Sequence, residues 1–205
     1  MKKGFADITL IVDRSGSMLA CRDDAEGGIN QLIEEQAAAG GDAVLTLVQF
    51  DTEYEFIHKG MPIKCVPKYT LVPRGMTALL DAVGKAIAET GERLAALAEA
   101  DRPDTVFCVI VTDGAENASR EFTKQQVCDM IETQKTDYNW QFTFIGASPD
   151  TFAVAGSFGI AADQTLQYDP SKTGDAYRTI SSAMSVSRGT GDMMSYTDED
   201  RKAVQ

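Results

Sequence analysis

The apolar residues of this chain fall into short runs that alternate between strand-like and helix-like spacing. Strands are predicted at 5–12, 105–111 and 140–147, and the segment 105–111 is apolar on both faces, as is typical of a buried parallel strand. Helical spacing of apolar residues predicts helices at about 23–39, 78–99, 123–134, 149–157 and 173–186. This alternation predicts a mostly parallel, doubly wound α/β sheet with helices on both faces.

Three further patterns complete the predicted fold. "AVLTLVQF" (43–50) and "EYEFIH" (53–58) are separated only by Asp51 and Thr52, which predicts a hairpin and one antiparallel strand. A short strand is expected near 165–167. Asp23 and Glu26 have the spacing of a capping box at the start of the first helix. We therefore expect one domain over 1–187, followed by a linker and a short acidic tail at 188–205.

Composition and charge exclude several classes of partner. The chain has 205 residues and a formal net charge of −12, and its Lys and Arg residues form no cluster longer than a pair. Binding to nucleic acid or to an anionic membrane is therefore disfavoured. Asp7 interrupts the apolar run behind the N-terminal lysines, so no signal peptide is predicted and we expect a cytoplasmic protein. The four cysteines lack CxxC spacing, which favours packed thiols.

Oxygen-bearing side chains gather at the predicted carboxyl ends of the strands. Asp13, Ser15 and Ser17 follow the first strand, Asp113 follows the strand at 105–111, and Thr77 precedes the long second helix. In a doubly wound sheet these strand ends can be adjacent. Hard oxygen ligands without nitrogen or sulfur favour Mg²⁺ or Mn²⁺, and the small number of carboxylates makes a Ca²⁺ site less favoured.

These residues carry a family resemblance. Asp13-x-Ser15-x-Ser17, Thr77 and Asp113 resemble the metal-ion-dependent adhesion site of von Willebrand factor A (vWA) domains, as do "FDTEYEF", "VPRGMTALLDAV" and "VIVTDGAEN". The resemblance covers about residues 5–187 and is to stand-alone bacterial or phage members. It implies a six-stranded sheet with one antiparallel edge strand, and a non-enzymatic binding module in which the three hydroxyls and two aspartates hold a metal, directly or through water.

The resemblance also implies a protein partner, because a carboxylate from that partner would complete the octahedron. Charge counting supports this expectation. Two carboxylates at most neutralise a divalent cation, so a site in which one acts through water still attracts an anionic oxygen from an Asp or Glu. Glu116 and Asn117 could support the site by hydrogen bonds, although an exposed loop explains them as well.

Two other functions stay open. Asp13 could be the nucleophile of an aspartyl-phosphate hydrolase or a phosphoacceptor, but Ser15 stands where the hydrolase family needs a second aspartate. The domain could instead be an accessory subunit of an ATPase or chelatase; the chain itself has no GxxxxGK[ST] loop.

The acidic tail raises a separate hypothesis of self-association. Asp198, Glu199 and Asp200 in the segment 192–205 could reach a neighbouring molecule's metal, with Thr197 capping a short helix. A solvated terminus is the preferred interpretation.

Overall fold

The computed structural model describes residues 1–205 and contains one six-stranded sheet. The strands are ordered β3-β2-β1-β4-β5-β6, and only the edge strand β3 runs antiparallel to its neighbour, so the predicted fold class is confirmed. The strand bounds are β1 Lys2–Asp13, β2 Asp42–Phe50, β3 Tyr54–Pro62, β4 Pro103–Val111, β5 Gln141–Gly146 and β6 Thr165–Gln167.

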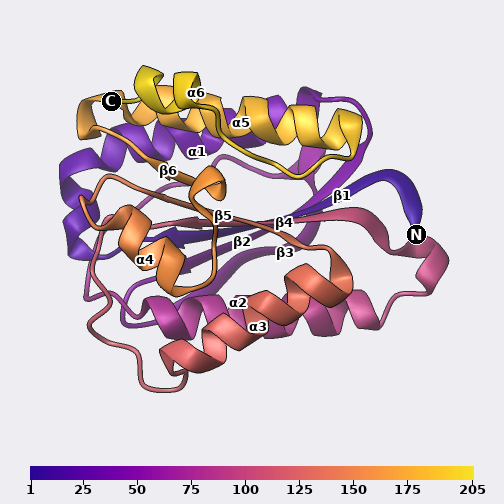
Figure 1. Ribbon diagram of the computed structural model, residues 1–205, viewed down its shortest axis with the longest axis horizontal. Coiled ribbons are helices and arrows are strands. Elements are labelled where there is room, and N and C mark those ends of the chain that lie inside the picture. Colours follow the sequence, from indigo (N-terminus) through magenta and orange to yellow (C-terminus); the bar gives the residue numbers. More distant parts are fainter.

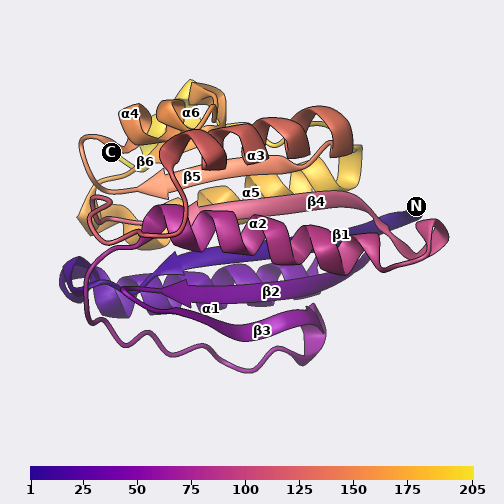
Figure 2. The same ribbon diagram turned by 90° about the horizontal axis from the view of Figure 1, so that it is seen from below.

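Helices cover both faces of the sheet. In Figure 1, α1, α5 and α6 lie above the sheet, and α2, α3 and α4 lie below it; Figure 2 shows α2 and α3 crossing the lower face. None of these helices is long and apolar enough to cross a membrane. Their bounds are α1 Arg22–Ala38, α2 Leu79–Ala95, α3 Lys124–Tyr138, α4 Thr151–Ser157, α5 Thr173–Thr190 and α6 Asp198–Ala203.

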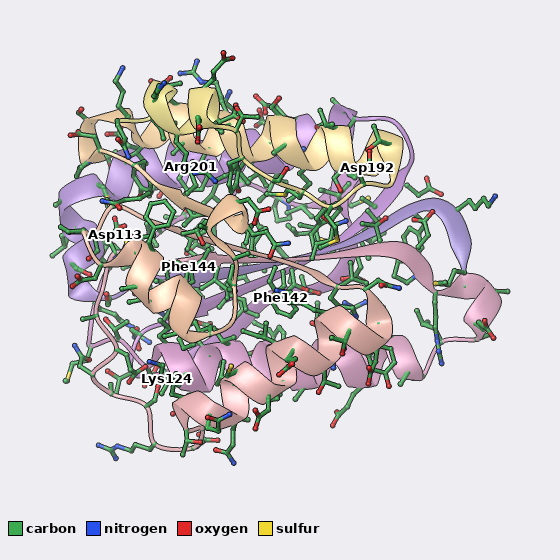
Figure 3. The ribbon with its side chains drawn as sticks, viewed as in Figure 1. Asp113, Lys124, Phe142, Phe144, Asp192 and Arg201 are labelled. Atoms are coloured by element: carbon green, nitrogen blue, oxygen red, sulfur yellow. The ribbon has the colours of Figure 1, made fainter.

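Each face of the sheet has its own apolar core. The strands β1 and β4 are buried on both sides, which accounts for the apolar run at the end of each, 10–12 and 106–111. Trp140, Phe142 and Phe144 alternate along the chain and lie in one cluster with residues of α2, α3 and α4, as their spacing predicts. Figure 3 shows Phe142 and Phe144 on the α2–α3 side of the sheet. These cores fix the relative positions of the strand ends.

Two helix starts differ from the prediction. A 3-10 helix, Gly16–Cys21, precedes α1, and Cys21 occupies the N-cap position without a side-chain cap, so Asp23 and Glu26 form no capping box. The Glu26 carboxylate instead accepts a hydrogen bond from the backbone N–H of Leu71. The capping box does not form because the Glu26 side chain bonds to a segment distant in sequence instead of to the backbone at the start of α1.

The C-terminal segment also differs from the expected linker and tail. α5 continues to Thr190, and Gly191 ends it in the left-handed conformation with φ 80°. Beyond it, Met194, Tyr196 and Val204 are buried against the α1–α5 face. Thr197 does cap α6, in a capping box with Asp200. The segment is therefore packed on the domain, because its three apolar side chains find a place in the core.

Candidate functional site

The candidate site lies at the carboxyl ends of the central strands. β1 pairs with β2 on one side and β4 on the other, with Asp13 opposite Phe50 and Val12 opposite Val111. The two strands therefore end at the same level, which brings the loops after β1 and β4 together at the point where strand order reverses. Figure 3 shows Asp113 at this end of the molecule, far from the N-terminus.

Asp13 is fully buried and held by two short hydrogen bonds. Its Oδ1 accepts from the backbone N–H of Ser15 at 2.6 Å, and its Oδ2 accepts from the Thr112 hydroxyl at 2.6 Å. Burial raises the pKa of the Asp13 carboxyl, these hydrogen bonds lower it, and the nearby Asp113 charge raises it. A cation beside this carboxylate would offset the cost of burying its charge.

Gly114 shows that three of the candidate ligands converge on one point. A Cβ built on Gly114 would lie 2.5 Å from Thr77 Oγ1, 3.0 Å from Asp13 Oδ2 and 3.1 Å from Ser15 Oγ. The loop after β4 therefore approaches the cluster closely only because residue 114 has no side chain. Two oxygens from the end of β1 and the loop after it, and one from the segment before α2, therefore surround the same small volume beside the loop after β4.

Of the other two candidate ligands, Ser17 extends this cluster, and Asp113 is held beside it by different groups. Ser17 Oγ is 2.9 Å from Ser15 Oγ, so it joins the group although the Ser17 residue is exposed. Asp113 Oδ1 accepts from the backbone N–H of Ala147 at 2.6 Å, and its Oδ2 accepts weakly from the Cys21 thiol and the Tyr168 hydroxyl, both at 3.4 Å. The Asp113 carboxylate is thus held by groups that follow β5 and β6 and by Cys21, and its charge is close enough to raise the pKa of Asp13.

Glu116 and Asn117 support the segment that carries Thr77. Asn117 Oδ1 accepts from the Thr77 backbone N–H at 2.9 Å, and Glu116 Oε2 accepts from the Leu80 N–H at 2.9 Å. Thr77 itself does not cap α2, whose N-cap residue is Ala78. Its hydroxyl is therefore free of the ordinary capping role and points into the oxygen cluster.

Sequence reasoning missed a buried ion-pair network behind the first loop. Arg14 Nε donates to Asp51 Oδ2 at 2.8 Å, and Arg74 Nε donates to the same oxygen at 2.8 Å. Backbone hydrogen bonds from Arg74 to Arg14 and from Gly16 to Gly75 join the two loops. The only sign of this network in the sequence was Arg14, which lies inside the Asp-x-Ser-x-Ser pattern. Asp51 and Arg74 are 37 and 60 residues away from it along the chain, so the sequence did not reveal the contact.

Thr112 and Gly114 were also missed as parts of the site. They stand on either side of Asp113 in "VIVTDGAEN", where a threonine and a glycine indicate only a turn. In the structure, Thr112 donates to Asp13 and Gly114 makes room for the cluster. Their roles depend on the contact between β1 and β4.

The donor set fits a hard divalent cation. The candidate donors are two carboxylates and three hydroxyls, and no group of three or more His, Cys, Asp and Glu side chains that could hold a metal ion is present. Cys21, the nearest sulfur ligand, is disfavoured as a thiolate because burial, together with the Asp113 charge, raises its pKa to about 12. Oxygen-only ligation of this kind favours Mg²⁺ or Mn²⁺.

The sheet order, the antiparallel edge strand and the helices on both faces define the vWA fold. The vWF domain of the type V pili tip protein Mfa5 from Porphyromonas gingivalis is similar over 94% of this chain and 98% of its own, with TM-score 0.65 and 12% identity. Proximal thread matrix protein 1 of the mussel byssus, solved with zinc in its MIDAS motif, is similar over 86% of this chain, with TM-score 0.60 and 12% identity.

A third similar structure is the ArnB paralog VWA2 from Sulfolobus acidocaldarius, with TM-score 0.55 and 18% identity over 87% of this chain. This chain spans about half the length of the mussel and Sulfolobus chains, 47% and 45%. No family model and no curated protein matches the amino-acid sequence. These likenesses show the fold.

Proposed function

We propose that this protein is a non-enzymatic binding module that uses a divalent cation to hold a carboxylate of a protein partner. The observation that carries the proposal is the convergence of Thr77, Asp13 and Ser15 oxygens beside Gly114. The mussel protein of similar fold, solved with zinc in its MIDAS motif, supports the binding of a divalent metal. The oxygen-only donor set favours Mg²⁺, with Mn²⁺ as the alternative.

Asp13, Ser15, Ser17, Thr77 and Asp113 would hold the cation. The bound cation would supply a positive charge that an incoming carboxylate can bind. The chain's own groups prepare for this: Thr112 and the Ser15 N–H orient Asp13, and the Ala147 N–H orients Asp113. Asn117 and Glu116 fix the backbone that carries Thr77. These supports reduce the reorganisation that metal binding requires.

The test is metal affinity by calorimetry with the full chain. Asp13→Ala should abolish measurable Mg²⁺ and Mn²⁺ binding, because it removes a charged ligand from the centre of the cluster. Asp23→Ala is the matched control: its side chain is 89% exposed and makes no contact with the cluster, so the variant should bind as the wild type does. Zn²⁺ is titrated in parallel. Unchanged Mg²⁺ and Mn²⁺ affinity in Asp13→Ala, with the fold retained, would refute the site.

The enzymatic alternative uses the same aspartate in a different way. As an aspartyl-phosphate nucleophile, Asp13 would need a general acid two residues on, but Ser15 occupies that position and faces the oxygen cluster. No lysine is among the hydrogen-bond partners of Asp13 or Asp113. A persistent beryllofluoride adduct on Asp13 would overturn the binding-module proposal in favour of the phosphoacceptor.

A further inference from the structure

Three strongly exposed apolar side chains lie beside the candidate metal centre. One is on the 3-10 helix Gly16–Cys21 in the first loop, after β1, and two are on the second loop, the segment 71–77 before α2. Leu19, Val72 and Met76, here called the apolar rim, are 66%, 60% and 52% exposed. The only other large apolar side chains exposed to this extent are Met1, Tyr138, Val186 and Met193. Exposed apolar side chains that gather around one site indicate a contact surface.

The 3-10 helix Gly16–Cys21 directs Leu19 toward the second loop. Residues three apart share a face of such a helix, so Gly16, Leu19 and Arg22 lie in one row. Both ends of this row contact the second loop: the Gly16 N–H donates to the Gly75 carbonyl at 3.3 Å, and Arg22 Nε donates to the Leu71 carbonyl at 3.0 Å. Leu19 therefore lies between two contacts to the segment 71–75, which includes Val72.

Met76 extends the rim to the metal centre, because it directly precedes Thr77. Its backbone N–H donates to Thr52 Oγ1 at 3.2 Å. Gly75 has φ +70°, and a Cβ there would lie 3.2 Å from Asp51 Cβ, so the turn packs tightly on the buried ion-pair network. The rim thus sits on a backbone that is held in place before any partner binds, which lowers the entropic cost of binding.

The arginines around the rim are already paired with carboxylates. Arg14 is buried and bonded to Asp51 and Glu55, and Arg74 is bonded to Asp51 and Glu53. Arg22 lies beside Asp23 and Glu26. A polyacidic partner would therefore meet these carboxylates and the chain's net charge of −12 rather than free cations. A partner with a single carboxylate and apolar neighbours fits this surface better.

We propose that the apolar rim selects the partner: a protein loop with one exposed Asp or Glu flanked by apolar side chains. The inference rests on the proposed function, since the carboxylate is the group the metal would take. The apolar neighbours of that carboxylate cover Leu19, Val72 and Met76. Burying such side chains supplies affinity that a single carboxylate–metal contact lacks, and it makes the contact specific.

The test uses the full chain and a displayed library of random cyclic peptides. The library is bound in Mg²⁺, eluted with EDTA, and sequenced. We expect the eluted peptides to carry one acidic residue flanked by Leu, Ile, Phe or Met. The affinity of an enriched peptide is then measured for the wild type, for the triple variant Leu19→Ser, Val72→Ser, Met76→Ser, and for the control Val186→Ser, Met193→Ser, whose side chains are 60% and 50% exposed elsewhere.

The rim variant should lose about tenfold or more in peptide affinity, while its Mg²⁺ affinity by calorimetry and the peptide affinity of the control stay at wild-type values. Enriched peptides that are polyacidic without apolar neighbours, or equal peptide affinity in the rim variant, would overturn the inference and leave the proposed function standing. If EDTA elutes no enriched peptide, the proposed function fails together with the inference.

Discussion

Gly114→Ala tests the site through the least change in chemistry. The added methyl group would lie 2.5 Å from Thr77 Oγ1, closer than any real Cβ contact, and 3.0 and 3.1 Å from the oxygens of Asp13 and Ser15. Asp13 cannot move easily, because its Oδ2 is fixed at 2.6 Å by Thr112. The contact is relieved by rotating the Thr77 hydroxyl out of the cluster or by shifting the loop, and either response displaces an oxygen ligand.

The expected losses of folding stability and of metal affinity follow from these two responses. Overpacking a tight site costs about 1–3 kcal/mol of folding stability. Displacing one oxygen ligand or its support costs about 10- to 100-fold in metal affinity, or about 1.4–2.8 kcal/mol. Calorimetry with Mg²⁺ and Mn²⁺ measures the affinity, and urea unfolding without metal measures the stability.

Gly91→Ala is the matched control. Gly91 lies inside α2, and a Cβ there would meet nothing within 4 Å, so the same substitution should keep metal affinity and stabilise the helix by about 0.5–1 kcal/mol. The reasoning is wrong if Gly114→Ala binds Mg²⁺ as tightly as Gly91→Ala does.

Two further predictions concern the supports of the site and of the sheet. Glu116→Ala should lower the free energy of unfolding by about 1–3 kcal/mol, because it leaves the backbone N–H of Leu80, at the start of α2, and those of Ala118 and Ser119, in the loop after β4, without their acceptor. Urea unfolding measures this loss, and Glu116→Gln should recover part of it. Deleting 192–205 should destabilise the domain by several kcal/mol, since it removes three buried apolar side chains. An unchanged melting temperature, measured by circular dichroism, would mean that the segment is not packed in solution; an unchanged oligomeric state by light scattering would argue against self-association through it.

Sequence reasoning performed best where a signal was local and repeated. The apolar runs of β1 and β4 and the hairpin at Asp51 and Thr52 identified the sheet, because burial on both faces and a short connection leave clear patterns. The candidate ligands could be grouped before the structure was known, since the carboxyl ends of parallel strands meet at one edge. Their ligation of a metal stays a prediction.

Sequence reasoning failed where a local signal competed with a distant contact. Asp23 with Glu26 looked like a capping box, yet that role is not realised. The expected linker at Arg188 is the last part of α5. In the first case the backbone N–H of Leu71, remote in sequence, donates to Glu26 instead.

The sequence by itself determined the alternation of strands and helices and the oxygen-rich loops at the strand ends, because these follow from periodicity and residue type. Only the tertiary structure decided how closely the oxygens converge on Gly114, how Arg14 and Arg74 share Asp51, and which apolar side chains surround the site. Those features arise from packing between segments tens of residues apart, and no local pattern records such distances.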